Sequence, residues 1–340
     1  MNALAVVDDQ LFSEHRAPSD HPERPERLDA ARAGLAKAHL AMGTLTLEPR
    51  DAADSELLRV HSAGYLARLG QAAGKDGYFD ADTFYAPRSV AAARRAAGGA
   101  VALVDALGDG RARFGLGLVR PPGHHARPDG AMGFCLLNNV AVAAAHARAR
   151  GTDRVAIVDF DVHHGNGTQE IFYSDPSVLF VSLHQYPFYP GTGAVGEVGR
   201  AEGTGFTVNV PLSAGAGDPA YVAAFDRVIT PILRQFDPGL VLISAGFDAH
   251  ERDPLASMSL SDVAYGLMVG RIAAAMPRGP NGRLALVLEG GYDLRAVSDS
   301  VAAALGALEE AVGGDVGEIA PRHAREIEQV LARQSEYWRL

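Results

Sequence analysis

The chain has 340 residues, of which 47% are hydrophobic and 21% are charged, a balance typical of a globular protein with a substantial core. Its net charge of −10 argues against a general nucleic-acid-binding surface, which would be basic. Cys135 is the only cysteine, which excludes an intrachain disulfide and favours a cytoplasmic protein. The sequence contains no run of about 18 uninterrupted apolar residues, so we expect no membrane span and no membrane partner.

In the first half of the chain, strands and helices are predicted to alternate. The apolar run Ala3–Val7, followed by two aspartates, predicts a first strand and not a signal peptide. The segment HPERPERL, residues 21–28, starts a helix, with Pro25 suited to its first turn. The further elements are helices over residues 55–73 and 91–107 and a strand over 116–119. Two loops stand out, an aromatic loop over 74–88 and a long loop over 120–135 that is rich in proline, glycine and histidine.

The second half continues the alternation. Strands are predicted over residues 155–158, 178–183, 206–210, 240–244 and 284–288, and helices over 136–148, 169–173 (with Thr168 as its N-cap), 221–236 and 261–275, before two closing helices. A second aromatic and glycine-rich loop covers residues 184–196. Since no proline- or serine-rich linker divides the chain, we expect one domain over residues 1–340. Its predicted fold is α/β, a doubly wound and mainly parallel sheet flanked by helices.

Unusual polar side chains follow four of the predicted strands. In an extended chain residues i, i+2 and i+4 point to one face, so Asp159, Asp161 and His163 converge where the strand over 155–158 ends. The other three strands are followed by His124 with His125, by Asp248, and by Tyr292. Ligands bind outside the carboxyl ends of parallel strands, so we expect these residues to meet in one site.

These residue types indicate a metal-dependent hydrolase. A set of three oxygen and nitrogen ligands with one open position is typical of catalytic zinc, and here the set is Asp161, His163 and Asp248. Zinc lowers the pKa of a bound water toward neutrality and polarises a carbonyl. The histidine pair could act as general base and acid, and Tyr292, which follows two glycines, could donate to a developing oxyanion.

Five segments resemble motifs of the zinc-dependent histone deacetylase family. They are RPPGHHA (120–126), DFDVHHGNGTQ (159–169), SLHQYPFYPGTG (182–193), SAGFDAHERDPL (244–255) and LEGGYDL (288–294). The resemblance covers nearly the whole chain, from HPERPERL to the final helices, and implies the arginase/deacetylase-like fold. The asparagine of HHGNGT and the GFDA segment resemble the class II branch, which includes bacterial deacetylase-like amidohydrolases and acetylpolyamine amidohydrolases.

The resemblance also implies roles for the catalytic residues. Asp161, His163 and Asp248 would bind one zinc ion, and Tyr292 would polarise the acetyl carbonyl. His125 would be the main general base and acid, and His124, oriented by Asp159, would be its electrostatic partner. Asn166 stands where class I enzymes have a second aspartate. Its amide oxygen can still accept a hydrogen bond from His125, but without a charge it should leave the pKa of His125 lower.

Further residues are implied in binding substrate and a second cation. Phe134 and Tyr189 would be two aromatic walls around the acetylated side chain, and Gly133, Leu255 and Gly291 would complete the substrate-binding residues. Tyr189 occupies a position that is more often phenylalanine. A structural monovalent cation, K⁺, would be bound by Asp159, Asp161, His163, Ser182 and Leu183.

The implied reaction is removal of an acetyl or acyl group from the Nε of acetyl-lysine in a protein or peptide. The alternative is deacetylation of a small acetylated amine, an acetylpolyamine, in the same site. In the class II enzymes that the chain resembles, an acidic residue after the Asp-Pro pair favours polyamines, and a leucine accompanies acetyl-lysine preference. The chain has Leu255 there, and an apolar side chain does not offset the desolvation of a polyamine cation.

Two other classes of protein compete with this interpretation. A binuclear manganese ureohydrolase of the arginase type needs a further carboxylate after Asp161 and His163, where the chain has Gly165. A degenerate acetyl-lysine-binding protein would be expected to have lost a ligand, a histidine of the pair, or Tyr292. Ordinary structural roles are expected for His164, His184, His250 and the buried thiol of Cys135.

Overall fold

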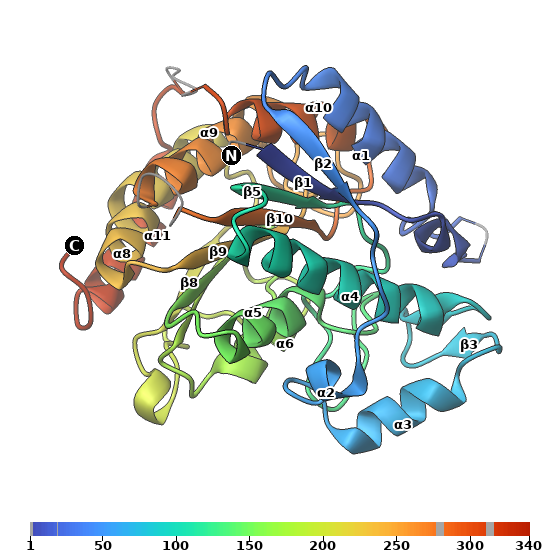
Figure 1. The fold of residues 1–340 in the computed structure, drawn as a ribbon. Coiled ribbons are helices and arrows are strands. Elements are labelled where there is room, and N and C mark those ends of the chain that lie inside the picture. Colours follow the sequence, from blue (N-terminus) through green and yellow to red (C-terminus); the bar gives the residue numbers. More distant parts are fainter. Residues whose placement is uncertain (1–2, 19, 277–281, 311–315) are drawn as a thin grey trace.

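The computed structural model describes residues 3–18, 20–276, 282–310 and 316–340. Eight of its strands form one sheet in the order β2-β1-β5-β10-β9-β6-β7-β8, and each neighbouring pair is parallel (Figure 1). The strands are β1 (Ala3–Val7), β2 (Gly43–Leu47), β5 (Phe114–Gly117), β6 (Val155–Asp159), β7 (Val178–Gln185), β8 (Thr207–Leu212), β9 (Leu240–Ala245) and β10 (Leu284–Leu288). The predicted doubly wound parallel sheet is confirmed.

Helices cover both faces of the sheet (Figure 1). On one face α4 (Ser89–Gly108) packs against β1, β5 and β10, and α5 (Asn139–Ala149) packs against β6 and β9. The other face is covered by α1 (Glu26–Lys37), α10 (Leu294–Gly306) and α9 (Asp262–Ala275), which pack in that order, with α9 against α8 (Thr230–Phe236). The central strands are therefore buried on both faces, and their apolar runs show no alternation.

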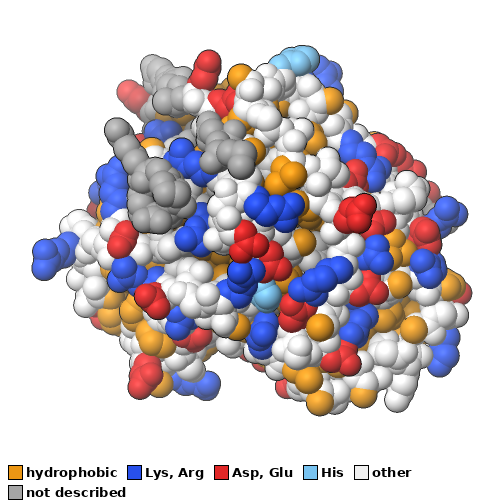
Figure 2. Space-filling model, viewed as in Figure 1, with side chains coloured by type: hydrophobic (Ala, Val, Ile, Leu, Met, Phe, Trp, Pro, Cys, Tyr) orange, Lys and Arg blue, Asp and Glu red, His pale blue; other side chains and the backbone are white. Residues whose placement is uncertain are grey.

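The remaining elements are short or peripheral. They are a 3₁₀ turn (Gln10–Glu14), α2 (Asp54–Leu57), α3 (Ala63–Gln71), the antiparallel pair β3 (Gly77–Tyr78) and β4 (Phe84–Tyr85), α6 (Asn166–Phe172), a 3₁₀ turn (Ala201–Gly203), α7 (Asp218–Ala224), a π-helical turn (Phe225–Ile229) and α11 (Pro321–Gln334). Within the described ranges, no helix is long and apolar enough to cross a membrane. Figure 2 shows basic and acidic side chains interspersed on the face that it presents.

Several predicted boundaries are wrong in the first half of the chain. The edge strand β2 was not expected, since its sequence GTLTL is short and its side chains are mostly exposed. The helix predicted over residues 55–73 is two helices, because the chain leaves the helix after α2 and Ser62 begins α3 by accepting the backbone N–H of Tyr65. The strand predicted over 116–119 is β5, which starts at Phe114. The helix predicted over 136–148 begins at Asn139, and the side chain of Asn138 caps it.

In the second half, Thr168 is not an N-cap. Helix α6 starts two residues earlier, and the Thr168 hydroxyl lies 3.0 Å from the Asn138 side-chain nitrogen inside the protein. The helix predicted over residues 221–236 is continuous only if its π-helical turn is included, as α7 and α8 flank that turn. The other predicted strands and helices are present, with ends that differ by one or two residues.

The strand order decides where the site can form. β5, β10, β9 and β6 are consecutive neighbours at the centre of the sheet. The four loops with unusual polar residues follow these four strands, so they lie side by side at one edge of the sheet. The neighbours β5 and β10, and likewise β9 and β6, are far apart in sequence, which is why only the folded sheet brings their loops together.

Candidate active site

Two carboxylates and an imidazole converge beyond the ends of β6 and β9. His163 Nδ1 lies 3.2 Å from Asp161 Oδ1 and 3.2 Å from Asp248 Oδ2. The ligand atoms of the three residues all lie within 4.8 Å of one another. Backbone N–H groups orient both carboxylates, since Gly290 donates to Asp161 at 2.8 Å and Val162 donates to Asp248 at 2.9 Å. The structure thus brings together the three predicted ligands.

The charge balance of this set fits a divalent cation. Burial disfavours a charged imidazole, but hydrogen bonds to Asp161 and Asp248 outweigh it and raise the pKa of His163 to about 10. Two buried carboxylates in contact with one imidazole therefore hold a proton strongly when no metal ion is present. Carboxylate oxygens and an imidazole nitrogen are among the ligands that zinc binds in proteins. Gly290 is required beside them, because a Cβ there would overlap the carboxylates of Asp248 and Asp161.

The histidine pair lies next to this set, with both rings buried. His124 Nδ1 lies 3.0 Å from Asp159 Oδ2, and His125 Nδ1 lies 2.7 Å from Asn166 Oδ1. Burial opposes a charge on His124, but the carboxylates of Asp161 and Asp159 outweigh burial and raise its pKa well above the ordinary value. Burial and the positive charges of neighbouring histidines lower the pKa of His125 well below the ordinary value. The two imidazoles are therefore electrostatically different.

Tyr292 reaches the same place from the loop after β10. Its ring lies edge-on to Phe134, with 6.1 Å between the ring centroids, and the Arg27 guanidinium lies 5.0 Å from its centroid. The backbone N–H of Tyr292 donates to Asp253 at 2.7 Å, and the other oxygen of Asp253 accepts the N–H of Leu255 at 3.0 Å. Asp253, the aspartate of the Asp-Pro pair before Leu255, therefore ties the loop of Tyr292 to the loop of Leu255.

These side chains line one cavity of about 170 Å³. Its lining residues are Asp82, Pro122, His124, His125, Gly133, Phe134, Cys135, His163, Phe188, Tyr189, Leu255, Gly290 and Tyr292. Asp82, Pro122 and Phe188 were not predicted, although each belongs to a loop or motif noted in the sequence. The cavity is not the largest hollow of the described surface, but His124, His125, His163 and Tyr292 all line it.

Four of the predicted substrate-binding residues line the cavity, and the fifth, Gly291, does not. Tyr189 lies edge-on to His125, with ring centroids 5.3 Å apart and an interplanar angle of 90°. Gly133 has φ +54°, and a Cβ there would overlap the His125 ring, so glycine is needed. Gly290, not Gly291, lines the cavity; the Gly291 carbonyl instead accepts a hydrogen bond from Arg27 Nε at 2.5 Å.

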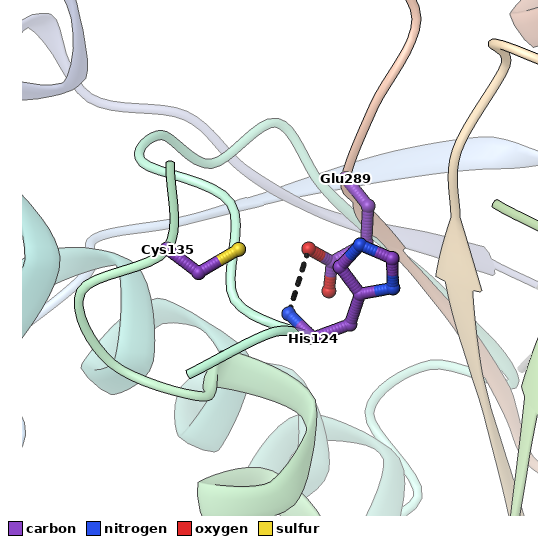
Figure 3. A group of neighbouring side chains, drawn as sticks. All are labelled: His124, Cys135 and Glu289. Carbon is purple, nitrogen blue, oxygen red and sulfur yellow. Dashed lines mark hydrogen bonds between the residues drawn. The ribbon is translucent and has the colours of Figure 1, made fainter. Parts of the chain in front are cut away.

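A second group of possible ligands is formed by His124, Cys135 and Glu289 (Figure 3). It does not fit a metal ion well. One oxygen of Glu289 already accepts the backbone N–H groups of Gly123 and His124, and His124 Nδ1 is bonded to Asp159. Burial raises the pKa of the Cys135 thiol well above its ordinary value, which disfavours the thiolate that a metal requires.

Other residues singled out in the sequence make ordinary structural contacts. His164 lies 2.8 Å from the Thr192 hydroxyl and 3.0 Å from Gln169 Oε1. His184 Nδ1 lies 3.0 Å from the Ser182 hydroxyl, on the strand next to Asp159. Ser182 and Leu183 therefore lie close to the site, and their role in binding a monovalent cation stays a prediction.

A buried charged network supports the site from the segment HPERPERL. Glu23 binds Arg120 with both carboxylate oxygens, at 2.5 and 2.6 Å, and lies 3.0 Å from the Arg27 guanidinium. Burial opposes ionisation of Glu23, but Arg120 outweighs it and keeps the pKa well below the usual range. Arg27 in turn donates to the carbonyl groups of Glu289 and Gly291. This network was not predicted from the sequence. The one available signal was that Glu23, Arg27 and Arg120 all lie close to prolines in two of the noted segments.

The fold and the site together define a class of proteins. Its members have the α/β architecture of arginases and deacetylases, with one set of candidate metal ligands at the carboxyl ends of the strands. A family model described as histone deacetylase domain matches residues 21–308. Histone deacetylase 15 of Arabidopsis thaliana is 45% identical over 294 residues, which are 85% of this chain and 52% of that protein. The human protein named polyamine deacetylase HDAC10 is 44% identical over 300 residues, 84% of this chain and 44% of its own. The chain thus spans about half the length of these relatives.

Solved structures agree with the sequence comparisons. The crystal structure of the HDA15 HD domain superimposes with a TM-score of 0.91 at 42% identity, covering 99% of this chain and 95% of that one. The chain belongs to the histone deacetylase family.

Proposed function

We propose that this chain is a zinc-dependent amidohydrolase that removes acetyl groups from the Nε of acetyl-lysine. One observation carries the proposal: Asp161, His163 and Asp248 converge at a cavity that His163 lines together with His125, whose imidazole is hydrogen-bonded to Asn166. Membership of the histone deacetylase family supports the same reaction. Zinc, when bound by the three ligands, would supply Lewis acidity to a carbonyl and a water of lowered pKa.

His125 is suited to accept a proton from the attacking water. Its Nδ1 donates to the amide oxygen of Asn166, which leaves Nε2 unprotonated. Its low pKa keeps the ring neutral near pH 7, the state that a general base requires. Once protonated, the same ring can deliver the proton to the departing amine. His124 has the raised pKa of a group that stays charged beside Asp159, and it would contribute charge to the site.

Tyr292 is suited to donate a hydrogen bond to the carbonyl oxygen of the substrate. Burial raises the pKa of its phenol well above 10, so the hydroxyl keeps its proton at neutral pH. Asp253 and Arg27 bind the N–H and the carbonyl of the Gly291–Tyr292 peptide group, which fixes the backbone that carries the ring. A preorganised donor of this kind stabilises the developing oxyanion.

The residues that line the cavity indicate which kind of substrate it could bind. Phe134 and Tyr189 supply aromatic surface for a methylene chain, and Leu255 adds an apolar side chain at the same cavity. This lining supports acetyl-lysine as substrate. A second candidate is an acetylpolyamine, since Asp82 lines the cavity as well and one relative is named a polyamine deacetylase.

The competing ureohydrolase has little support from the site. The residue after His163 and His164 is Gly165, and a Cβ at that position would already overlap the Asp159 carboxylate. No third carboxylate can therefore project from this position to bind a second metal ion. Class II assignment, a structural K⁺ ion and a cytoplasmic location are further parts of the proposal that follow from the sequence motifs and composition.

Metal analysis combined with a substrate panel tests the proposed function. Purified protein should contain about one zinc ion per chain and hydrolyse a fluorogenic acetyl-lysine peptide. A chelator should abolish the hydrolysis, and added zinc should restore it. The panel compares acetyl-lysine peptides, longer acyl-lysine peptides and acetylspermidine. Hydrolysis that persists after complete metal removal would contradict the proposal.

A further inference from the structure

Glu289, at the end of β10, is a fully buried carboxylate for which the proposed reaction has no direct use. Its Oε2 accepts the backbone N–H of Gly123 at 2.6 Å and that of His124 at 3.1 Å (Figure 3). Its Oε1 lies 3.4 Å from the Ser244 hydroxyl on the neighbouring strand β9. The side chain therefore joins two strands of the sheet to the segment that carries the histidine pair.

The contacts of Glu289 differ from those of a buried ion pair. The guanidinium of Arg27 is bonded to this residue, but it donates to the backbone carbonyl and not to the carboxylate. Among the hydrogen bonds of the described residues, those of the carboxylate come from the two N–H groups and one hydroxyl. The carboxylate thus forms its hydrogen bonds with the backbone of the catalytic loop and the Ser244 hydroxyl, and its charge also acts on the nearby His124 imidazole.

The carbonyl groups of the same segment are held from the opposite side. The backbone N–H of Thr168 donates to the His124 carbonyl at 3.1 Å, and Asn138 Nδ2 donates to the Ala126 carbonyl at 3.2 Å. Glu289 therefore supplies the acceptors for this loop, and α6 and Asn138 supply the donors. Without Glu289, the Gly123 and His124 N–H groups would be buried and unpaired, which disfavours the present conformation of the loop.

We propose that Glu289 is a positioning residue, whose carboxylate oxygen fixes the backbone of Gly123 and His124 and thereby the placement of the His124 and His125 rings. The inference rests on the proposed function, because it assigns Glu289 an effect on the turnover of that site. Displacement of catalytic groups by about 1 Å can lower a rate by about 10². Loss of Glu289 should therefore reduce kcat more than it changes KM.

The geometry also predicts which substitution restores function. Both N–H groups donate to one oxygen, so the amide oxygen of glutamine can accept both, and its NH₂ group can donate to Ser244. Burial raises the pKa of Glu289 to about 7, so the site already tolerates a neutral group. Methionine has a similar length but no oxygen to accept a hydrogen bond.

The kinetic test compares Glu289→Met, Glu289→Gln and wild type on the acetylated amine that the wild type hydrolyses best. We expect Glu289→Met to lower kcat by about tenfold or more with KM and zinc content little changed, and Glu289→Gln to stay within about threefold of wild type. Glu56→Met is the matched control. Glu56 is also a buried carboxylate that accepts a backbone N–H, from Ala53 at 2.8 Å, but it lies outside the site, so its loss should lower stability and leave kcat unchanged.

Amide hydrogen exchange of the metal-free protein provides the second readout. The Gly123 and His124 N–H groups should exchange faster in Glu289→Met than in wild type, and at the wild-type rate in Glu289→Gln. Unchanged kcat in Glu289→Met, or an equal loss of kcat in both variants, would overturn the inference. If Glu289→Met does not fold, a kcat that is about tenfold or more lower in Glu289→Gln than in wild type overturns the inference by itself. Failure of the wild type to hydrolyse any acetylated amine would reject the proposed function, while the exchange result would still test the contact.

Discussion

The side chains of His125 and Asn166 form a directed hydrogen bond, with 2.7 Å between His125 Nδ1 and Asn166 Oδ1. Asn166 Nδ2 faces Met132 Sδ at 3.4 Å, so the amide oxygen is the atom that meets the imidazole. An amide oxygen only accepts, so Nδ1 carries the proton and Nε2 is free to act as a base. The amide thus sets the tautomer without adding a charge.

Replacing this amide by a carboxylate should move the pH profile. Asn166→Asp places a negative charge next to His125, which favours the imidazolium and raises the pKa of the ring. Since the neutral ring is the base, the acidic limb of the kcat/KM profile should shift upward by about one pH unit or more. Asn166→Ala, which adds no charge, should lower the rate without this upward shift. An acidic limb that stays in place in Asn166→Asp would show that His125 is not the titrating base.

Removing any one predicted ligand should abolish both zinc binding and hydrolysis. Asp161→Ala, His163→Ala and Asp248→Ala each leave two of the three donors, and the remaining donors cannot hold the ion at the affinity of the full set. Zinc per chain is measured by elemental analysis after dialysis. Asp237→Ala, an exposed carboxylate at the opposite edge of the sheet, is the control and should keep full zinc content. Full zinc retention in all three variants would refute the assignment.

Tyr292→Phe should separate chemistry from metal binding. The substitution removes only the hydroxyl, and the contacts of the backbone with Asp253 and of the ring with Arg27 remain. We expect kcat to fall by about 10² or more, the usual effect of losing one oxyanion donor. Zinc content and melting temperature should match wild type. An unchanged kcat would mean that the hydroxyl does not contact the reacting carbonyl.

The sequence could predict the position of a side chain where that position depends on residues nearby in the chain. Asp159, Asp161 and His163 lie two residues apart at the end of one strand, so the sequence indicated that they are close together, although the chain bends over residues 161–163 once β6 has ended at Asp159. Asp248 and Tyr292 needed only the rule that parallel strands end at the same edge. The meeting of these side chains at one edge of the sheet was therefore predictable, and their role as zinc ligands stays a prediction.

The parts that were missed depend on tertiary contacts. Glu289 was read as part of a motif, because nothing local shows that its oxygen reaches Gly123, 166 positions away in sequence. The buried bonds of Glu23 with Arg120 span 97 positions. Strand β2 carries too little apolar surface for its pattern to be recognised, and its place beside β1 is visible only in the sheet. Thr168 is a favourable cap by residue type, but the turn at Gly165 starts the helix earlier.

The substrate class should depend on two residues of the cavity wall with opposite character, Leu255 and Asp82. Leu255 is apolar, and a cationic polyamine placed against it would lose hydration without gaining a partner. We therefore expect a higher kcat/KM for acetyl-lysine peptides than for acetylspermidine.

Leu255→Glu should shift this ratio toward acetylspermidine, since a carboxylate at the cavity would attract its ammonium groups. The screened interaction of two charges at about 4 Å is roughly 1 to 4 kcal/mol, so the shift should be about tenfold or more. Asp82→Asn is the complementary variant: if Asp82 attracts polyamines, its loss should reduce acetylspermidine turnover and leave a neutral acetyl-lysine peptide nearly unaffected. Wild-type preference for acetylspermidine that neither variant changes would reject both the role of Leu255 and the acetyl-lysine assignment.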